Sequence, residues 1–317
     1  MAQTILVTGA TGFAGSHLLD RLPAGARVIA WARPGGTRPP AARDAGRNGA
    51  EVEWRGVDLL DRAAVRRAVA ETQPALVYHV AGAPHVGTSF DNPALPLTIN
   101  ALGTHYMLSA IADEAPRARV VVVTSAMIYG PCAVAHTEAS PMAPGSPYGL
   151  SKLAQDRLAA LAAGDGVNAV IARPFNHTGA RQDPSFAIPG FAQQIARIEA
   201  GRAEPVIRVG NLDAERDLSD VRDVVDAYAV IAERGETGTA YNVCSGTAWR
   251  IGDLLEQLLR RSRVAVRVEQ EEARIRPIEL PRLVGDNTRL RSLGWTPRIP
   301  LETMLDDVLE YWRSRAE

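Results

Sequence analysis

The chain has 317 residues, of which 46% are hydrophobic and 22% charged, and its formal net charge at pH 7 is −1. These fractions are typical of globular proteins and exclude a disordered or fibrous chain. A nearly neutral chain has no basic field for nucleic acid, and no run of about 18 apolar residues could cross a membrane, so neither partner is expected.

Three smaller features of the composition narrow the class further. The N-terminus lacks the charged, apolar and small-residue pattern of a signal peptide, so we expect a cytoplasmic protein. Cys132 and Cys244 are the two cysteines, and they have no C-x-x-C spacing, which argues against a disulfide framework or a metal site. Lys152 is the sole lysine beside 34 arginines, so a lysine is specifically needed at this position.

The first half of the chain alternates β-branched runs with amphipathic segments, an order typical of βαβ units in a parallel sheet. We expect strands over residues 4–7, 27–32, 51–55, 76–80, 120–124 and 168–172. Helices are expected over 13–22, 63–71, 97–114 and 148–163. The predicted fold class is α/β, with a doubly wound parallel sheet over residues 1–174.

From residue 175 onward the pattern is looser. Helices are expected over 189–200, 223–233, 251–261 and 301–315, and short strands over 206–209 and 264–268. We interpret 175–317 as a smaller α/β substrate domain, with the chain crossing between the two domains.

The sequence T-G-A-T-G-F-A-G ends the first predicted strand and opens the first predicted helix. At such a place Gly9 permits a tight turn, Gly12 lets a pyrophosphate approach the backbone, and Gly15 allows close helix packing. An ordinary strand-to-helix turn is the alternative. We predict a dinucleotide site formed by Gly9, Thr11, Gly12, Phe13, Ala14 and Gly15.

The end of the second strand indicates which dinucleotide binds. It has no carboxylate for the ribose of NAD, whereas Arg33 can pair with the 2′-phosphate of NADP. Arg33 could instead begin an exposed basic loop, so NADP(H) is favoured and NAD(H) stays open. Loops after the third and fourth strands would meet the adenosine through Asp58, Leu59, Val80, Ala81 and Gly82. Asp58 has an alternative role as the cap of the helix that follows.

Tyr148 and Lys152 stand four residues apart, on one face of a predicted helix. An ammonium there would stabilise the phenolate and lower the pKa of Tyr148 from about 10, making it a usable proton donor or acceptor. A chance Y-x-x-x-K is the alternative, but arginine could not replace this lysine chemically.

Ser125, at the end of the fifth strand, would hold a substrate carbonyl oxygen, with Thr124 as the alternative. Outside such a pair, a serine at this place is more often a cap or turn residue.

The glycine motif, H-V-A-G-A, T-S-A-M-I-Y-G, Y-x-x-x-K and R-P-F-N together resemble the extended short-chain dehydrogenases/reductases, which have a Rossmann fold. In the second half, R-P-F-N-H-T-G, V-G-N-L-D-A-E-R-D and R-P-I-E-L-P-R-L-V-G-D resemble the branch that acts on GDP-linked sugars. The resemblance implies a homodimer, and Tyr148 and Lys152 in contact with the cofactor. It implies a substrate site of Thr88, Ser89, Ser125, Asn176, Arg216, Arg276 and Glu279. The three charged residues among these could instead be surface charges.

The resemblance further implies NADPH-dependent reduction of the C4 ketone of GDP-4-keto-6-deoxy-D-mannose. The expected product is GDP-D-rhamnose, with the talose epimer as an alternative. Sugar 4,6-dehydratases carry a glutamate where this chain has Met127, and a thioether cannot move a proton, which favours reduction. A 4-epimerase stays open, because it uses the same trio on NAD, as does a non-catalytic NADP-binding regulator.

Overall fold

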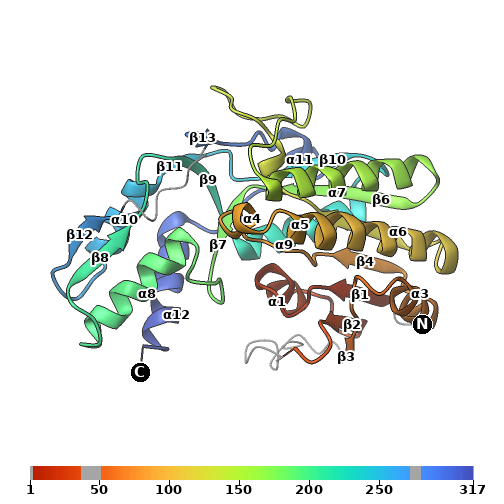
Figure 1. The fold of residues 1–317 in the computed structure, drawn as a ribbon, viewed down its shortest axis with the longest axis horizontal. Coiled ribbons are helices and arrows are strands. Elements are labelled where there is room, and N and C mark those ends of the chain that lie inside the picture. The colour runs from red at the N-terminus through yellow and green to blue at the C-terminus, as the bar shows by residue number, and fades with distance from the viewer. Residues whose placement is uncertain (1–2, 37–50, 272–279, 317) are drawn as a thin grey trace.

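The computed structural model describes residues 3–36, 51–271 and 280–316, and its centre is a seven-stranded parallel sheet (Figure 1). The strand order is β10-β6-β5-β4-β1-β2-β3, so the order reverses between β1 and β4. The strands are β1 (Thr4–Thr8), β2 (Arg27–Ala32), β3 (Glu51–Gly56), β4 (Leu76–His79), β5 (Arg119–Val123), β6 (Asn168–Pro174) and β10 (Ala240–Val243). Such a reversal opens a crevice at the carboxyl ends of the strands, where ligands bind.

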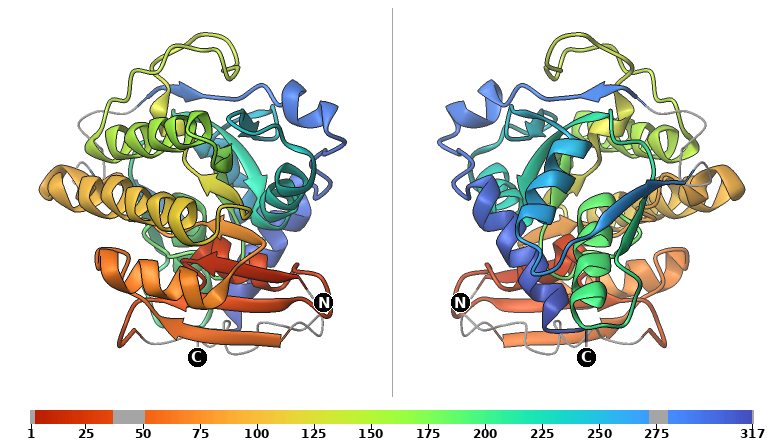
Figure 2. Two further views of the ribbon diagram at one scale, coloured as in Figure 1. Left: turned by 90° about the vertical axis from the view of Figure 1, so that its right-hand side faces the viewer. Right: turned by 90° about the vertical axis from the view of Figure 1, so that its left-hand side faces the viewer.

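Helices cover both faces of this sheet, as Figures 1 and 2 show. One face carries α3 (Arg62–Thr72), α6 (Gly103–Glu114) and α7 (Pro147–Gly164), and the other carries α1 (Phe13–Leu19), α9 (Val221–Arg234) and α11 (Thr288–Ser292). Successive side chains of a strand point to opposite faces, so Leu6 packs into one layer while Ile5 and Val7 pack into the other. The predicted doubly wound α/β fold is confirmed.

The region predicted as one helix over 97–114 is subdivided. It begins with a π-helical turn, η1 (Leu97–Leu102), which continues into α6. Two short helices precede it, α4 (Thr88–Asp91) and α5 (Ala94–Pro96), and a 3-10 turn, η2 (Ala126–Ile128), follows β5.

A smaller body lies beyond the carboxyl edge of the sheet. Its core packs α8 (Ala187–Glu199), α10 (Ile251–Arg260) and α12 (Leu301–Arg313) together with β8 (Val206–Val209). The strand expected at 264–268 lies further along, as β12 (Arg267–Gln270), and pairs with β8. A second small sheet joins β9 (Glu215–Asp220) to β7 (Asn176–Thr178), β11 (Ala248–Arg250) and β13 (Arg282–Leu283).

The chain returns to the large sheet after entering the smaller body. Helix α9 packs on β5 and β6, and β10 adds the seventh strand beside β6. Residues 221–243 therefore belong in space with the first 174 residues. Among the described residues, no helix is both long and apolar enough to cross a membrane.

Candidate active site

A cavity of about 1790 Å³ lies between the carboxyl edge of the large sheet and the smaller body. Pockets for one drug-sized ligand measure roughly 300–1,000 Å³, so the volume of this cavity exceeds that needed for one such ligand. It is lined by the turn between β1 and α1, by the ends of β4 and β5, and by the start of α7. The predicted catalytic residues Ser125, Tyr148 and Lys152 all line it.

The glycine-rich turn forms one end of the cavity. Gly9 has a φ of +66°, and a Cβ there would lie 2.6 Å from the Cα of Ala81. A Cβ on Gly15 would lie 2.2 Å from the carbonyl oxygen of Gly9, so a side chain at either position would collide with backbone. Helix α1 begins at Phe13 behind Gly12, which has no side chain to cap it, and its first N–H groups stay available to an anion. This cradle fits a dinucleotide pyrophosphate.

Every other residue predicted for the cofactor also lines the cavity: Thr11, Ala14, Arg33, Asp58, Leu59, Val80, Ala81 and Gly82. Arg33 is exposed just past β2. The carboxylate of Asp58 accepts a hydrogen bond from the backbone N–H of Leu60 at 2.9 Å. Asp61, rather than Asp58, caps α3, since its carboxylate accepts from Ala64 N at 2.9 Å. The helix-cap alternative for Asp58 is therefore wrong.

The residues after β5 distinguish Ser125 from Thr124. Thr124 is buried, and its hydroxyl donates to the carbonyl of Ala172 at 3.1 Å. The hydroxyl of Ser125 is hydrogen-bonded to the phenol of Tyr148 and also accepts from Met127 N at 3.1 Å. Of the two, Ser125 is the one placed to share a ligand atom with Tyr148.

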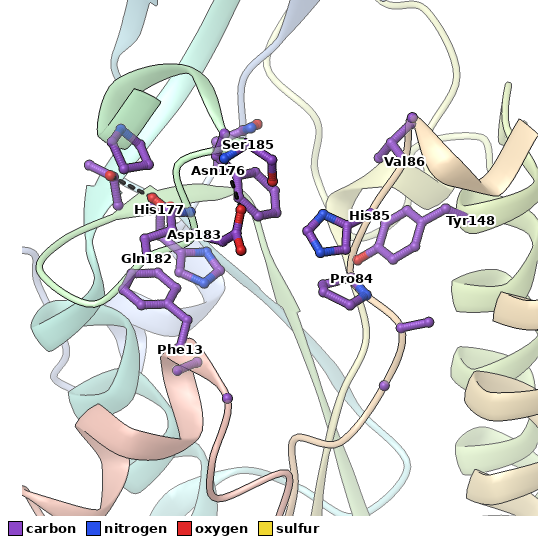
Figure 3. Close-up of a pocket in the computed structure, with 18 of the residues that line it drawn as sticks. Phe13, Pro84, His85, Val86, Tyr148, Asn176, His177, Gln182, Asp183 and Ser185 are labelled. Atoms are coloured by element: carbon purple, nitrogen blue, oxygen red, sulfur yellow. Dashed lines mark hydrogen bonds between the residues drawn. The ribbon is translucent and has the colours of Figure 1, made fainter. Parts of the chain in front are cut away.

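The start of α7 fixes the place of Tyr148. Ser146 caps the helix by accepting from Gly149 N at 3.0 Å, and Pro147 follows in the first turn, where a proline is tolerated. Tyr148 N donates to the hydroxyl of Ser89 at 3.3 Å. Figure 3 shows the Tyr148 ring pointing into the cavity beside His85.

The expected lowering of the Tyr148 pKa by Lys152 is wrong for this structure. Burial raises the pKa of Tyr148, and the hydrogen bond from Ser125 only partly opposes that shift. The ammonium of Lys152 is directed elsewhere, donating to Val123 O at 3.0 Å and to Gln155 Oε1 at 2.7 Å. Burial lowers the pKa of Lys152 itself to about 7. Tyr148 therefore keeps its proton at neutral pH, and a protonated phenol is the form that can protonate a substrate oxygen.

Two walls face each other across the site (Figure 3). Pro84, His85, Val86 and Tyr148 lie on one wall, and Asn176, His177, Gln182, Asp183 and Ser185 lie on the other. The ring of His85 stacks on Phe186, with centroids 5.3 Å apart, and so connects the loop after β4 to the loop before α8. His85 could not be predicted as a site residue from its sequence pattern, although it stands only two residues beyond the H-V-A-G-A motif.

The residues predicted for the substrate are only partly brought together. Thr88, Asn176 and Arg216 line the cavity. Ser89 departs from the expectation: it is buried, and its hydroxyl donates to Val86 O at 2.6 Å while accepting from Tyr148 N. It supports Tyr148 from behind. Arg276 and Glu279 lie outside the described residues.

Few carboxylates reach the cavity. Among its described lining residues they are Asp58, Asp183 and Glu204. Hydrogen bonds from Ser185 lower the pKa of Asp183, so Asp183 stays ionised and is a poor proton donor. Met127 lines the cavity next to Ser125, where a thioether offers no acid–base chemistry.

Comparison with known proteins extends over the full length of the chain. Residues 6–308 match the family model described as GDP-mannose 4,6 dehydratase. GDP-6-deoxy-D-mannose reductase of Pseudomonas aeruginosa is 36% identical and covers 99% of each chain. A GDP-mannose 4,6-dehydratase of Sordaria araneosa is 29% identical, over 97% of this chain and 60% of its own. The structure of RMD from Pseudomonas aeruginosa complexed with NADPH superimposes with a TM-score of 0.84 at 32% identity, covering 99% of this chain and 100% of that one.

Proposed function

Because the chain belongs to the GDP-mannose 4,6-dehydratase family of extended short-chain dehydrogenases/reductases, we propose that it reduces a GDP-linked 4-keto sugar with NADPH. As a member of this family it is an NAD(P)-dependent oxidoreductase. Dehydratases and epimerases share the fold, so the choice among these activities depends on the site.

The observation that carries the proposal is the hydrogen-bonded pair of Ser125 and Tyr148, in which burial raises further the pKa of a phenol that is already protonated at neutral pH. Reduction of a ketone needs one proton donor at the oxygen. Dehydration across C5 and C6 needs a further acid–base group. The resemblance to the sugar dehydratases implies that their glutamate corresponds to Met127 of this chain. The relative with 36% identity is named a reductase, which supports the same choice.

In the proposed reaction the chain binds, orients and protonates. NADPH, when bound, supplies a hydride to C4 of the sugar. The Ser125 hydroxyl holds the C4 oxygen, Tyr148 gives it a proton, and Lys152 lies one helical turn further along α7. The glycine-rich turn holds the cofactor pyrophosphate, and Arg33 pairs with its 2′-phosphate.

The substrate proposed is GDP-4-keto-6-deoxy-D-mannose, and the product is GDP-6-deoxy-D-mannose, which is GDP-D-rhamnose. Thr88 and Asn176 would contact the hexose, Arg216 would offset the pyrophosphate charge, and Arg276 with Glu279 would hold the nucleoside. Binding energy from these remote contacts would orient the ketone toward the cofactor.

The experiment that tests the function supplies this 4-keto sugar with NADPH, follows cofactor oxidation and determines the product by NMR. We expect one NADPH consumed per sugar and the rhamnose configuration at C4. Turnover of GDP-mannose to the ketone would show that the chain is a 4,6-dehydratase and would contradict the proposal. Interconversion of two sugars without net cofactor use would indicate an epimerase, and NADPH binding without any turnover would indicate a regulator.

Two further proposals concern assembly and location. We propose a homodimer formed through α5, η1 and α7, which pack against one another and carry the exposed side chains Leu95, Leu102, Leu150 and Leu161. Light scattering should give the mass of two chains, and arginine at positions 150 and 161 should reduce it to one. A reaction that consumes NADPH and a nucleotide sugar is expected in the cytoplasm.

A further inference from the structure

Lys152 is held from behind by a chain of buried hydrogen bonds, and we propose that Gln155, the first member of this chain, positions the Lys152 ammonium for the reaction. The inference rests on the proposed function, since it takes Lys152 as an active-site group. Gln155 touches no ligand in this proposal. It acts through Lys152 and is a positioning residue.

The chain of hydrogen bonds crosses four elements of the large sheet and its helices. Lys152 Nζ donates to Gln155 Oε1 at 2.7 Å, and Gln155 Nε2 donates to Thr104 Oγ1 on α6 at 2.7 Å. Thr104 Oγ1 is 2.9 Å from His79 Nε2 at the end of β4. His79 Nδ1 is 2.9 Å from Thr8 Oγ1 at the end of β1. None of the five residues is more than 5% exposed, so the chain of hydrogen bonds is shielded from bulk water.

The chemistry of the groups favours one direction for this chain of hydrogen bonds. In its protonated form Lys152 only donates, so the amide of Gln155 turns its oxygen to the ammonium and its nitrogen to Thr104. With Thr104 accepting from Gln155, its own proton is free for His79 Nε2. The ring hydrogen then lies on Nδ1 of His79, from which it is donated to Thr8. Burial, with a smaller contribution from the charge of Lys152, lowers the pKa of His79 to about 3, so the ring is neutral at neutral pH.

The arrangement leaves Lys152 with one free donor. Two of the three ammonium hydrogens are used by Gln155 and by the carbonyl of Val123 at 3.0 Å. The third remains for a ligand in the cavity that Lys152 lines. Without Gln155 a buried donor would lose its partner, which is costly, and the ammonium would move to find another. Its direction toward the ligand therefore depends on Gln155.

The far end of this chain of hydrogen bonds, at Thr8, reaches the glycine-rich turn. Thr8 immediately precedes Gly9, and its hydroxyl also accepts from the N–H of Ala81 at 3.2 Å. The same buried chain thus fixes Lys152 and the backbone on both sides of the cofactor cradle. A change at Gln155 should be felt at His79, two hydrogen bonds away.

The first test measures the ring of His79 directly and needs no substrate. Protein labelled with ¹⁵N-histidine has six histidine side chains, and the signal of His79 is assigned by its loss in His79→Gln. We expect the hydrogen on Nδ1 and an unprotonated Nε2. In Gln155→Met, Thr104 no longer has to accept, so the Nε2–H form should appear. An Nε2–H ring in the unmodified protein, or a spectrum unchanged by Gln155→Met, would overturn the proposal.

The second test separates positioning from binding. Gln155→Met should lower kcat by about tenfold to a hundredfold, while KM for NADPH and for the 4-keto sugar changes by less than about threefold. Gln155→Glu keeps an oxygen for Lys152 and should retain most of kcat. Thr72→Val is the matched control. It removes a buried hydroxyl that donates to Ala68 O at 2.6 Å and takes no part in the chain of hydrogen bonds from Lys152 to Thr8.

The possible outcomes remain distinct. An unchanged kcat in Gln155→Met contradicts the positioning role, even where the reductase activity itself is found. If Gln155→Met does not fold, Gln155→Glu replaces the donor to Thr104 by an acceptor, so the Nε2–H form of the His79 ring should appear in that variant while most of kcat is kept. If the unmodified protein does not reduce the ketone, the proposed function fails, and the ¹⁵N measurement still decides whether the directed chain exists.

Discussion

The hydroxyl of Ser125 is hydrogen-bonded to the phenol of Tyr148, although the first follows β5 and the second opens α7. The neighbouring hydroxyl of Thr124 is committed to the carbonyl of Ala172. A carbonyl oxygen placed between Ser125 and Tyr148 would meet two O–H groups at once. This is the arrangement that a proton-donating site for a ketone requires.

Tyr148→Phe should therefore abolish most of the turnover while leaving the cofactor bound. We expect kcat to fall by roughly 10²- to 10⁴-fold, the usual contribution of a positioned proton donor, with little change in NADPH affinity measured by fluorescence titration. Ser125→Ala should also lower kcat, and the double variant should be little worse than Tyr148→Phe because both groups serve one step.

Thr124→Val is the matched control for these variants. Its hydroxyl donates to Ala172 O at 3.1 Å and lies 3.4 Å from Asp156 Oδ2, so we expect a loss of stability near 1 kcal/mol and an unchanged kcat. A loss of turnover in Thr124→Val as large as that in Ser125→Ala would contradict the assignment of Ser125.

Burial of Lys152 should make the stability of the ligand-free protein depend on pH. Its pKa is about 7 when folded and near its ordinary 10.5 when unfolded, so between these values the unfolded chain binds more protons. Stability must then rise with pH over this window, by up to roughly 1.4 kcal/mol per pH unit. Urea unfolding at pH 7, 8 and 9 should show this rise, and Lys152→Met should lack that part of it. Parallel curves for the two proteins would refute the shift.

The central strands could be predicted because they are buried on both faces and read as β-branched runs, such as the valines of β5. Strand β10 escaped prediction for a physical reason. It is four residues long and holds Asn242, a polar side chain in a buried strand. That side chain accepts from the hydroxyl of Tyr129 at 2.7 Å and donates to His136 O at 2.8 Å. Partners a hundred residues away make the strand possible, and no local pattern reveals them.

In the active site, too, local features could be predicted from the sequence, whereas features set by packing between elements could not. The glycine turn and the Tyr148–Lys152 spacing are local features, and the structure places them at one cavity. The pKa of Tyr148 depends on burial, and the direction of Lys152 depends on Gln155 and Val123. These are properties of packing between elements, which residue spacing does not contain.

The buried ion pair of Arg173 and Asp156 joins β6 to α7 behind the site. The guanidinium donates to both carboxylate oxygens, at 2.8 and 2.9 Å, and neither side chain is more than 5% exposed. Asp156→Asn should cost about 3–5 kcal/mol, because it leaves a buried charge uncompensated. Arg173→Met combined with Asp156→Asn should cost less than the sum of the two single changes. Urea denaturation of the four proteins measures the coupling, and additive losses would show that the pair contributes none.

Arg33 should set the preference for NADPH over NADH. It is exposed at the end of β2 and lines the cavity beside the glycine-rich turn, where a 2′-phosphate would meet a charge-assisted contact. We expect Arg33→Ala to weaken NADPH binding about tenfold, as expected for loss of a contact worth 1–2 kcal/mol, and to leave NADH binding unchanged. Calorimetry with both cofactors, at low and at high salt, measures the difference.

The matched control for this prediction is Arg27→Ala. Arg27 begins the same strand at its opposite end, pairs with Glu53 at 3.1 Å and does not line the cavity. Removing it changes the net charge of the protein as much as removing Arg33 does, so any general effect of charge on a polyanionic cofactor should appear in both variants. Only Arg33→Ala should reduce the difference in affinity between NADPH and NADH. Where Arg33 is present, that difference should decrease at high salt, because salt screens the contact with the 2′-phosphate. Equal affinity for NADPH and NADH in the unmodified protein would show that Arg33 does not read the 2′-phosphate.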